Sequence, residues 1–221
     1  MLKKMYAFDE EIKSIWKYPV LDGIVNLKKY KATSPKILWI LKEANKSEGI
    51  KEIWDHREFH EDVTSYLYWY RTYTKIIYVS YGIINNILNY NSLPPLDENA
   101  FCNGDYVLNK IAIINLNKGG GSSRSNNSVI KNHYFKNKDF HHRQIKAFKP
   151  DIIINASGVW ELFSDLTNDE YKQISGQKLF YSIKDNQLII NWYHPNARLS
   201  EPIYINTIFK AVKKYNEFLS K

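Results

Sequence analysis

Four short runs of apolar, mostly β-branched residues constrain the fold of this chain more than any other feature of its sequence. Continuous runs of this length are typical of strands in a parallel sheet that is covered on both faces. The four runs are residues 36–41, 111–114, 151–156 and 188–192. Segments with helical spacing lie before and between them and at the end of the chain, at residues 9–18, 61–89, 140–148, 159–166 and 202–219. This alternation predicts the α/β class, as a three-layer α/β/α sandwich around a central four-stranded, mainly parallel sheet.

The chain has 221 residues and shows no internal repeat, linker or low-complexity tract, so we expect residues 1–221 to form a single domain and a monomer. Cys102 is the single cysteine, which excludes a disulfide framework and a cysteine-ligated zinc or iron–sulfur site within one chain. Neither a secretory signal nor a run of 18 apolar residues is present. We therefore expect a cytoplasmic protein that does not enter a membrane.

A formal net charge of +8 at pH 7 favours a polyanionic partner, and nucleic acid is the commonest one. The abundance of Lys, Asn, Ile and Tyr has a second explanation, because an AT-rich genome produces the same composition. The net charge therefore favours a nucleic-acid partner but does not establish one.

In an open α/β sheet, ligands bind beyond the carboxyl ends of the strands, so the segments that follow the apolar runs are the candidate site. The first segment contains Glu43, which fits the floor of a cleft, although an ordinary helix-capping turn explains it equally well. The second, residues 115–127, has three consecutive glycines that would let the backbone approach a phosphate. A plain surface loop is the alternative there.

His194 follows the last apolar run and is held by Pro195, which places it at the functional end of the predicted sheet. The other histidines are less constrained. His56 and His60 have a spacing that could bind a metal, but no HExxH motif is present, so we expect no metal site.

Taken together, these segments resemble the uracil-DNA glycosylase superfamily. Residues 41–45 (LKEAN) occupy the place of its first motif, which reads GQDPY, GINPG or GEAPG in different branches. Residues 115–118 (NLNK) match NxxK, and residues 194–198 (HPNAR) match the HPS loop with Asn196 in place of the serine. Residues 148–158 resemble the third strand and the glycine after it. The resemblance spans roughly residues 36–200, and it departs from the family at Leu41, Glu43 and Ala44.

The resemblance implies a DNA glycosylase that hydrolyses the N-glycosidic bond of a flipped uracil, damaged or modified base, in repair or in defence against modified foreign DNA. Glu43 and His194 would be catalytic, the first orienting water or stabilising the sugar cation and the second stabilising the departing base. Asn115 would read the base edge, with Asn45 and Ala44 beside it. The expected DNA contacts are Lys118, Ser122, Arg124, Asn196 and Arg198. No cofactor is expected.

An aromatic side chain should stack on the flipped base, and the candidates are Trp54, Tyr66, Tyr68 and Trp69. Two alternatives to a glycosylase stay open. One is a relative that binds nucleic acid without catalysis, and the other is a nucleoside or nucleotide hydrolase.

Overall fold

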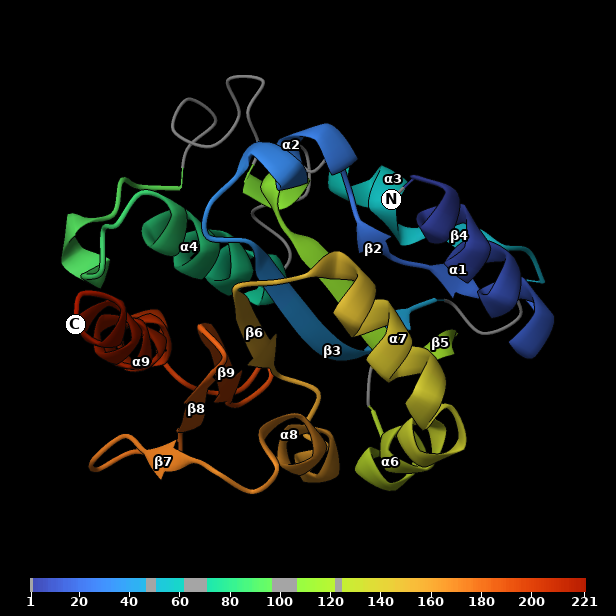
Figure 1. Ribbon diagram of the computed structural model, residues 1–221. Coiled ribbons are helices and arrows are strands. Elements are labelled where there is room, and N and C mark those ends of the chain that lie inside the picture. The colour runs from blue at the N-terminus through green and yellow to red at the C-terminus, as the bar shows by residue number, and fades with distance from the viewer. Residues whose placement is uncertain (1, 47–50, 62–70, 97–106, 122–124) are drawn as a thin grey trace.

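The computed structural model describes residues 2–46, 51–61, 71–96, 107–121 and 125–221, and it is a mixed α/β fold (Figure 1). A seven-stranded sheet has the order β2-β5-β3-β6-β9-β8-β7. Its strands are β2 (Gly23–Ile24), β3 (Ile37–Asn45), β5 (Ala112–Gly121), β6 (Ile152–Asn155), β7 (Lys172–Gln173), β8 (Phe180–Lys184) and β9 (Gln187–Asn191). A separate two-stranded sheet joins β1 (Val20–Leu21) to β4 (Trp54–Asp55).

The predicted α/β class is confirmed, but the prediction of a four-stranded sheet is wrong. The pairs β3–β5, β3–β6 and β6–β9 are parallel, whereas β2, β8 and β7 join the sheet through antiparallel pairs. These three strands escaped the sequence reading because β2 and β7 have two residues each and β8 mixes polar with apolar residues. Strands this short or this mixed in polarity carry no continuous apolar run.

Helices cover both faces of the sheet because successive side chains of its inner strands point to opposite sides. Ile37 and Trp39 face one core, which α4 (Arg71–Ile84), α9 (Glu201–Leu219) and η2 (Val107–Lys110) complete. Leu38 and Ile40 face a second core. That core includes residues of α2 (Leu27–Ala32), α6 (Asn127–Lys136), α7 (Lys138–Phe148) and α8 (Trp160–Thr167). The remaining elements are α1 (Leu2–Ile15), α3 (His56–Glu61) and η1 (Tyr90–Ser92).

Most predicted helices are present with shifted ends. The predicted helix at residues 61–89 corresponds in its described part to α4, which ends at Ile84, and Asn86 adopts a left-handed φ of 55° just beyond it. Residues 62–70 of that prediction lie outside the described residues. Helix α7 ends as expected before Pro150, with Lys149 at a φ of 51°. Helix α6 was not predicted.

Two of the predicted loops are strands. β3 continues to Asn45 and β5 to Gly121, so residues 42–45 and 115–121 extend the ladder rather than forming loops. Glu43 pairs with Asn117, and Asn45 pairs with Gly121 after a bulge. Backbone hydrogen bonds continue where the apolar pattern stops, because ladder pairing depends on the neighbouring backbone and not on side-chain polarity.

No helix in the described part of the chain combines the length and apolar character that crossing a membrane requires.

Candidate functional site

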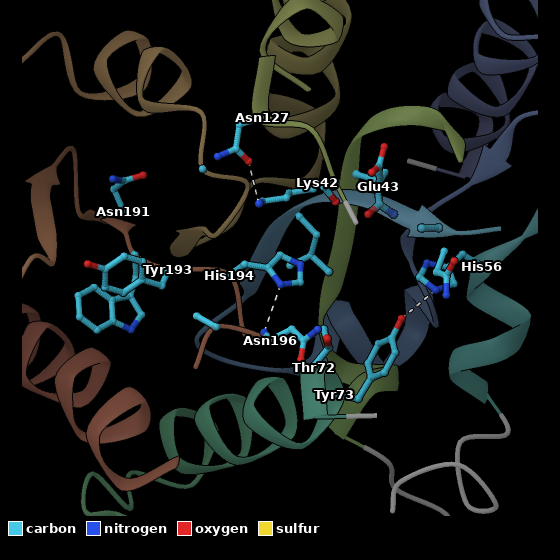
Figure 2. A pocket seen from close by; sticks show the side chains of 18 of the residues that line it. Lys42, Glu43, His56, Thr72, Tyr73, Asn127, Asn191, Tyr193, His194 and Asn196 are labelled. Carbon is cyan, nitrogen blue, oxygen red and sulfur yellow. Dashed lines mark hydrogen bonds between the residues drawn. The ribbon is translucent and has the colours of Figure 1, made fainter. Parts of the chain in front are cut away.

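A cavity of about 800 Å³ opens at the carboxyl ends of β3 and β9 and beside Asn115 of β5 (Figure 2). Its walls include Glu43, Asn115 and His194, three residues from segments far apart in the sequence. Ala44, Asn45 and Asn196 line it as well. The cavity thus brings together both expected catalytic residues and all three expected base-binding residues.

Glu43 is held in the cavity by a neighbour that the sequence reading missed. The Asn117 side chain donates from Nδ2 to Glu43 Oε2 at 2.9 Å and to the Gly120 carbonyl at 3.0 Å. Asn117 Oδ1 in turn accepts the Gly119 N–H at 3.0 Å. The signal was present in the NLNK motif, since residues two apart in a strand share a face. Asn117 therefore orients the carboxylate.

Gly121 packs directly against the Glu43 carboxyl group. A Cβ atom at position 121 would lie 2.1 Å from the carboxyl carbon of Glu43, which is closer than two such atoms can approach. The end of β5 must therefore carry glycine for the carboxylate to occupy this place.

Asn115 is 1% exposed and lies opposite Leu41 in the β3–β5 ladder. Its backbone N–H donates to Asp22 Oδ2 at 2.7 Å, and its carbonyl accepts from Lys118 Nζ at 3.1 Å. Neither Oδ1 nor Nδ2 of its side chain has a hydrogen-bond partner among the described residues. Buried amides are almost always hydrogen-bonded, so one that lines a cavity without a partner points to a ligand with a complementary donor and acceptor.

His194 lies in the turn after β9, where the backbone N–H of Asn196 donates to His194 Nδ1 at 3.2 Å. Because Nδ1 accepts, the neutral ring carries its proton on Nε2. Burial lowers the pKa of His194 to about 4, and the positive charges of Lys42 and Lys75 act in the same direction. At neutral pH the side chain is therefore an uncharged hydrogen-bond donor.

The turn that carries His194 is held from two helices. Lys75 of α4 donates from Nζ to the carbonyls of Ala197 at 3.0 Å and Leu199 at 2.9 Å. Tyr204 of α9 donates its hydroxyl to the Tyr193 carbonyl at 2.8 Å. These contacts fix the turn relative to the sheet, and Lys75 was not anticipated from the sequence.

Lys42 is the half-buried cation of the cavity wall, and its Nζ donates to Asn127 Oδ1 at 2.8 Å (Figure 2). Burial lowers the pKa of Lys42, whereas the charge of Glu43 acts in the opposite direction. Lys178 is exposed and lines the same cavity. These two lysines provide positive charge at the site.

Trp54, His56 and Tyr73 form an aromatic part of the cavity wall. His56 Nε2 and the Tyr73 hydroxyl lie 2.8 Å apart, and the Trp54 ring centroid is 5.1 Å from that of His56. Burial lowers the pKa of His56 to about 4, so its ring is neutral at pH 7. Of the four stacking candidates, Trp54 lines the cavity, whereas Tyr66, Tyr68 and Trp69 lie outside the described residues.

The assignment of Lys118 to a DNA phosphate is wrong. Lys118 is 0% exposed and forms an ion pair with Asp22, with Nζ–oxygen distances of 2.7 and 2.9 Å. Arg198 is exposed but does not line the cavity, and Ser122 and Arg124 lie outside the described residues. The sequence could not show that Lys118 is buried. Its side chain points into the interior because β5 continues through residue 118.

The parts of the chain that the structure describes hold no group of three His, Cys, Asp or Glu side chains placed to bind a metal ion.

Comparison with known proteins did not place the chain in a family. No family model matches it, and no curated protein matches it either.

Proposed function

We propose that this protein is an N-glycosyl hydrolase that acts on a nucleobase flipped out of DNA, as the resemblance to the uracil-DNA glycosylase superfamily implies. The observation that carries the proposal is the buried, unpartnered amide of Asn115 in a cavity that also contains the Glu43 carboxylate and the neutral His194.

Asn115 supplies base recognition. Its amide offers an acceptor and a donor side by side, which is the pattern needed to pair with the Watson–Crick edge of a base. Leaving a buried polar group without a partner costs about 1–3 kcal/mol, so a base that satisfies both atoms gains that energy on binding. A base without the complementary edge leaves the cost in place, which provides selectivity.

Glu43 and His194 divide the chemistry of bond cleavage. Water adds to C1′ of the sugar, Glu43 accepts the proton that the water loses, and the C1′–N bond breaks with its electron pair passing to the base. The carboxylate also favours the positive charge that develops on the sugar. His194 donates from Nε2–H to an oxygen of the departing base, where negative charge develops, and it does so without itself carrying charge.

DNA binding draws on the positive charge of the protein. The chain carries a formal net charge of +8, and Lys42 and Lys178 add cations at the cavity itself. These lysines take the place that Lys118 was expected to have. A flipped nucleotide brings its phosphates to the rim of such a cavity, where cations neutralise them.

The test measures base release from single- and double-stranded oligonucleotides that carry uracil, deaminated purines, alkylated bases or modified cytosines. We expect release of one of these classes. Glu43→Gln should lower the rate about 100- to 10,000-fold because the variant cannot accept a proton. His194→Ala should lower it about 100- to 1,000-fold, as expected for loss of one preorganised donor. Glu217→Gln is the matched control, since it removes the same charge from an exposed site on α9 and should leave release unchanged.

Two outcomes would overturn the proposal. Salt-sensitive DNA binding without base release from any substrate would show a binding protein. Cleavage of free nucleosides without cleavage in DNA would show a nucleoside hydrolase.

A further inference from the structure

Strand β5 loses its backbone partner on one side just before the functional residues begin. The last pair between β2 and β5 on this side is Gly23 with Ile113. Leu21 then pairs with Asp55 in the separate two-stranded sheet, so the chain leaves the edge of β5 at Asp22. Asn115 lies two residues beyond the last pair, where no β2 backbone remains to bond with it.

Two side chains replace the missing strand at Asn115. Asp22 Oδ2 accepts the Asn115 N–H at 2.7 Å, and Lys118 Nζ donates to the Asn115 carbonyl at 3.1 Å. Asp22 and Lys118 also bind each other, so one ion pair holds both the N–H and the carbonyl of Asn115. We call Asp22 and Lys118 together the Asn115 clamp.

Both side chains of the clamp are almost completely buried. The Lys118 and Asp22 side chains are 0% and 1% exposed, and Lys118 Nζ lies 5.6 Å from the centre of the Phe140 ring. Removing two charges from water costs several kcal/mol per ion, and apolar residues of similar size are often as stable or more so. Since a buried ion pair is weak evidence for stability, the geometry that Asp22 and Lys118 impose on Asn115 is the more informative feature.

We infer that Asp22 and Lys118 are positioning residues that fix Asn115 so that its amide faces the cavity without a partner of its own. This inference rests on the proposed function, and it assigns base selectivity to the clamp as well as to Asn115. Neither Asp22 nor Lys118 lines the cavity, so their direct contact with the site is through the Asn115 backbone.

The test uses the double variant Asp22→Asn/Lys118→Met, which removes both charges and releases the Asn115 carbonyl while keeping an acceptor for the Asn115 N–H. The variant avoids the unpaired buried charge that either single change would leave. We expect the variant to remain folded, as a single cooperative unfolding transition would show. Its kcat/KM for base release should fall about 10- to 100-fold, as for a displaced binding group. In an Asn115→Ala background the same double change should cause no further loss.

A structural role would behave differently. The control is Asp9→Asn/Asp55→Asn/Arg57→Met, which removes another largely buried group of paired charges, in which Arg57 binds both aspartates, without touching Asn115. Its effect on base release should be the same with and without Asn115. If the clamp variant also loses activity equally in both backgrounds, or loses none, the inference is wrong.

A second measurement needs no substrate and separates failure of this inference from failure of the proposed function. NMR should show one sharp pair of side-chain amide resonances for Asn115 in the native protein and broadened or doubled resonances in the clamp variant. Unchanged resonances would refute the clamp. Absence of base release in the native protein would refute the glycosylase alone.

Discussion

At the scale of single residues, one backbone contact determines which nitrogen of His194 carries the proton. The Asn196 N–H occupies Nδ1, and burial together with two nearby lysines keeps the ring uncharged. A neutral donor suits a leaving base, because its hydrogen bond strengthens as negative charge develops. The chemistry of the residue is therefore set by its surroundings and not by its identity alone.

The state of His194 can be measured directly. In ¹⁵N NMR spectra across a pH series, we expect His194 to be the neutral Nε2–H tautomer at pH 7 and to gain a proton with a pKa of about 4. Lys42→Met should raise that pKa, since it removes one of the charges that oppose protonation. A midpoint near 6.5, the ordinary value for histidine, would contradict the environment described here.

At the scale of elements, the site depends on how far β3 and β5 continue past their apolar parts. Their pairing beyond Leu41 brings Glu43 beside Asn117 and sets Gly121 against the carboxylate. The apolar runs predicted where these strands begin, but they could not predict where the strands end. The polar ends look like loops in the sequence because a strand that borders a cavity has no apolar face to bury there.

Gly121→Ala tests this arrangement. The new methyl group would lie 2.1 Å from the Glu43 carboxyl carbon, so we expect Glu43 to move and base release to fall about 10- to 100-fold. A crystal structure of the variant should show the displaced carboxylate.

Gly176→Ala is the control, because no heavy atom lies within 4 Å of the added Cβ and its φ of +72° produces only local strain. It should lower the melting temperature slightly without changing base release. Equal activity of Gly121→Ala and the native protein would show that the position of Glu43 does not matter.

At the scale of the whole molecule, buried histidines link folding to pH. Burial lowers the pKa of His56 to about 4 and holds that of His141 well below its ordinary value. Both groups bind a proton more readily in the unfolded chain, so they stabilise the fold fully above about pH 6.5. The contribution of His56 is lost as the pH falls from 6.5 toward 4.

Urea unfolding at pH 7 and pH 4.5 measures this loss. We expect the free energy of unfolding to fall by about 2–3 kcal/mol on account of His56 alone, which is the value of a shift of this size at pH 4.5. His56→Gln should be less stable than the native protein at pH 7 but should lose correspondingly less on acidification. An identical loss in both proteins would exclude His56 as a source.

The sequence by itself determined the α/β class, the positions of the inner strands and the end of the sheet at which polar residues gather. It could do so because apolar runs, and the proline and polar residues that end them, are local features of the sequence. They can be identified without knowing which segments lie next to them in the fold. It also singled out Glu43, Asn115 and His194, which share one cavity wall.

Only the tertiary structure decided what the neighbouring polar residues do. The letters NLNK do not show whether the lysine is exposed to solvent or bound to an aspartate 96 positions away. In the structure, Lys118 is buried against Asp22, and Asn117 donates a hydrogen bond to Glu43. Those partners depend on strand register and on where β2 leaves the sheet, and both are set by pairing between distant segments. The same motif therefore contains one residue that lines the cavity, one that binds Glu43 and one that is buried in the interior, and its letters alone do not distinguish them.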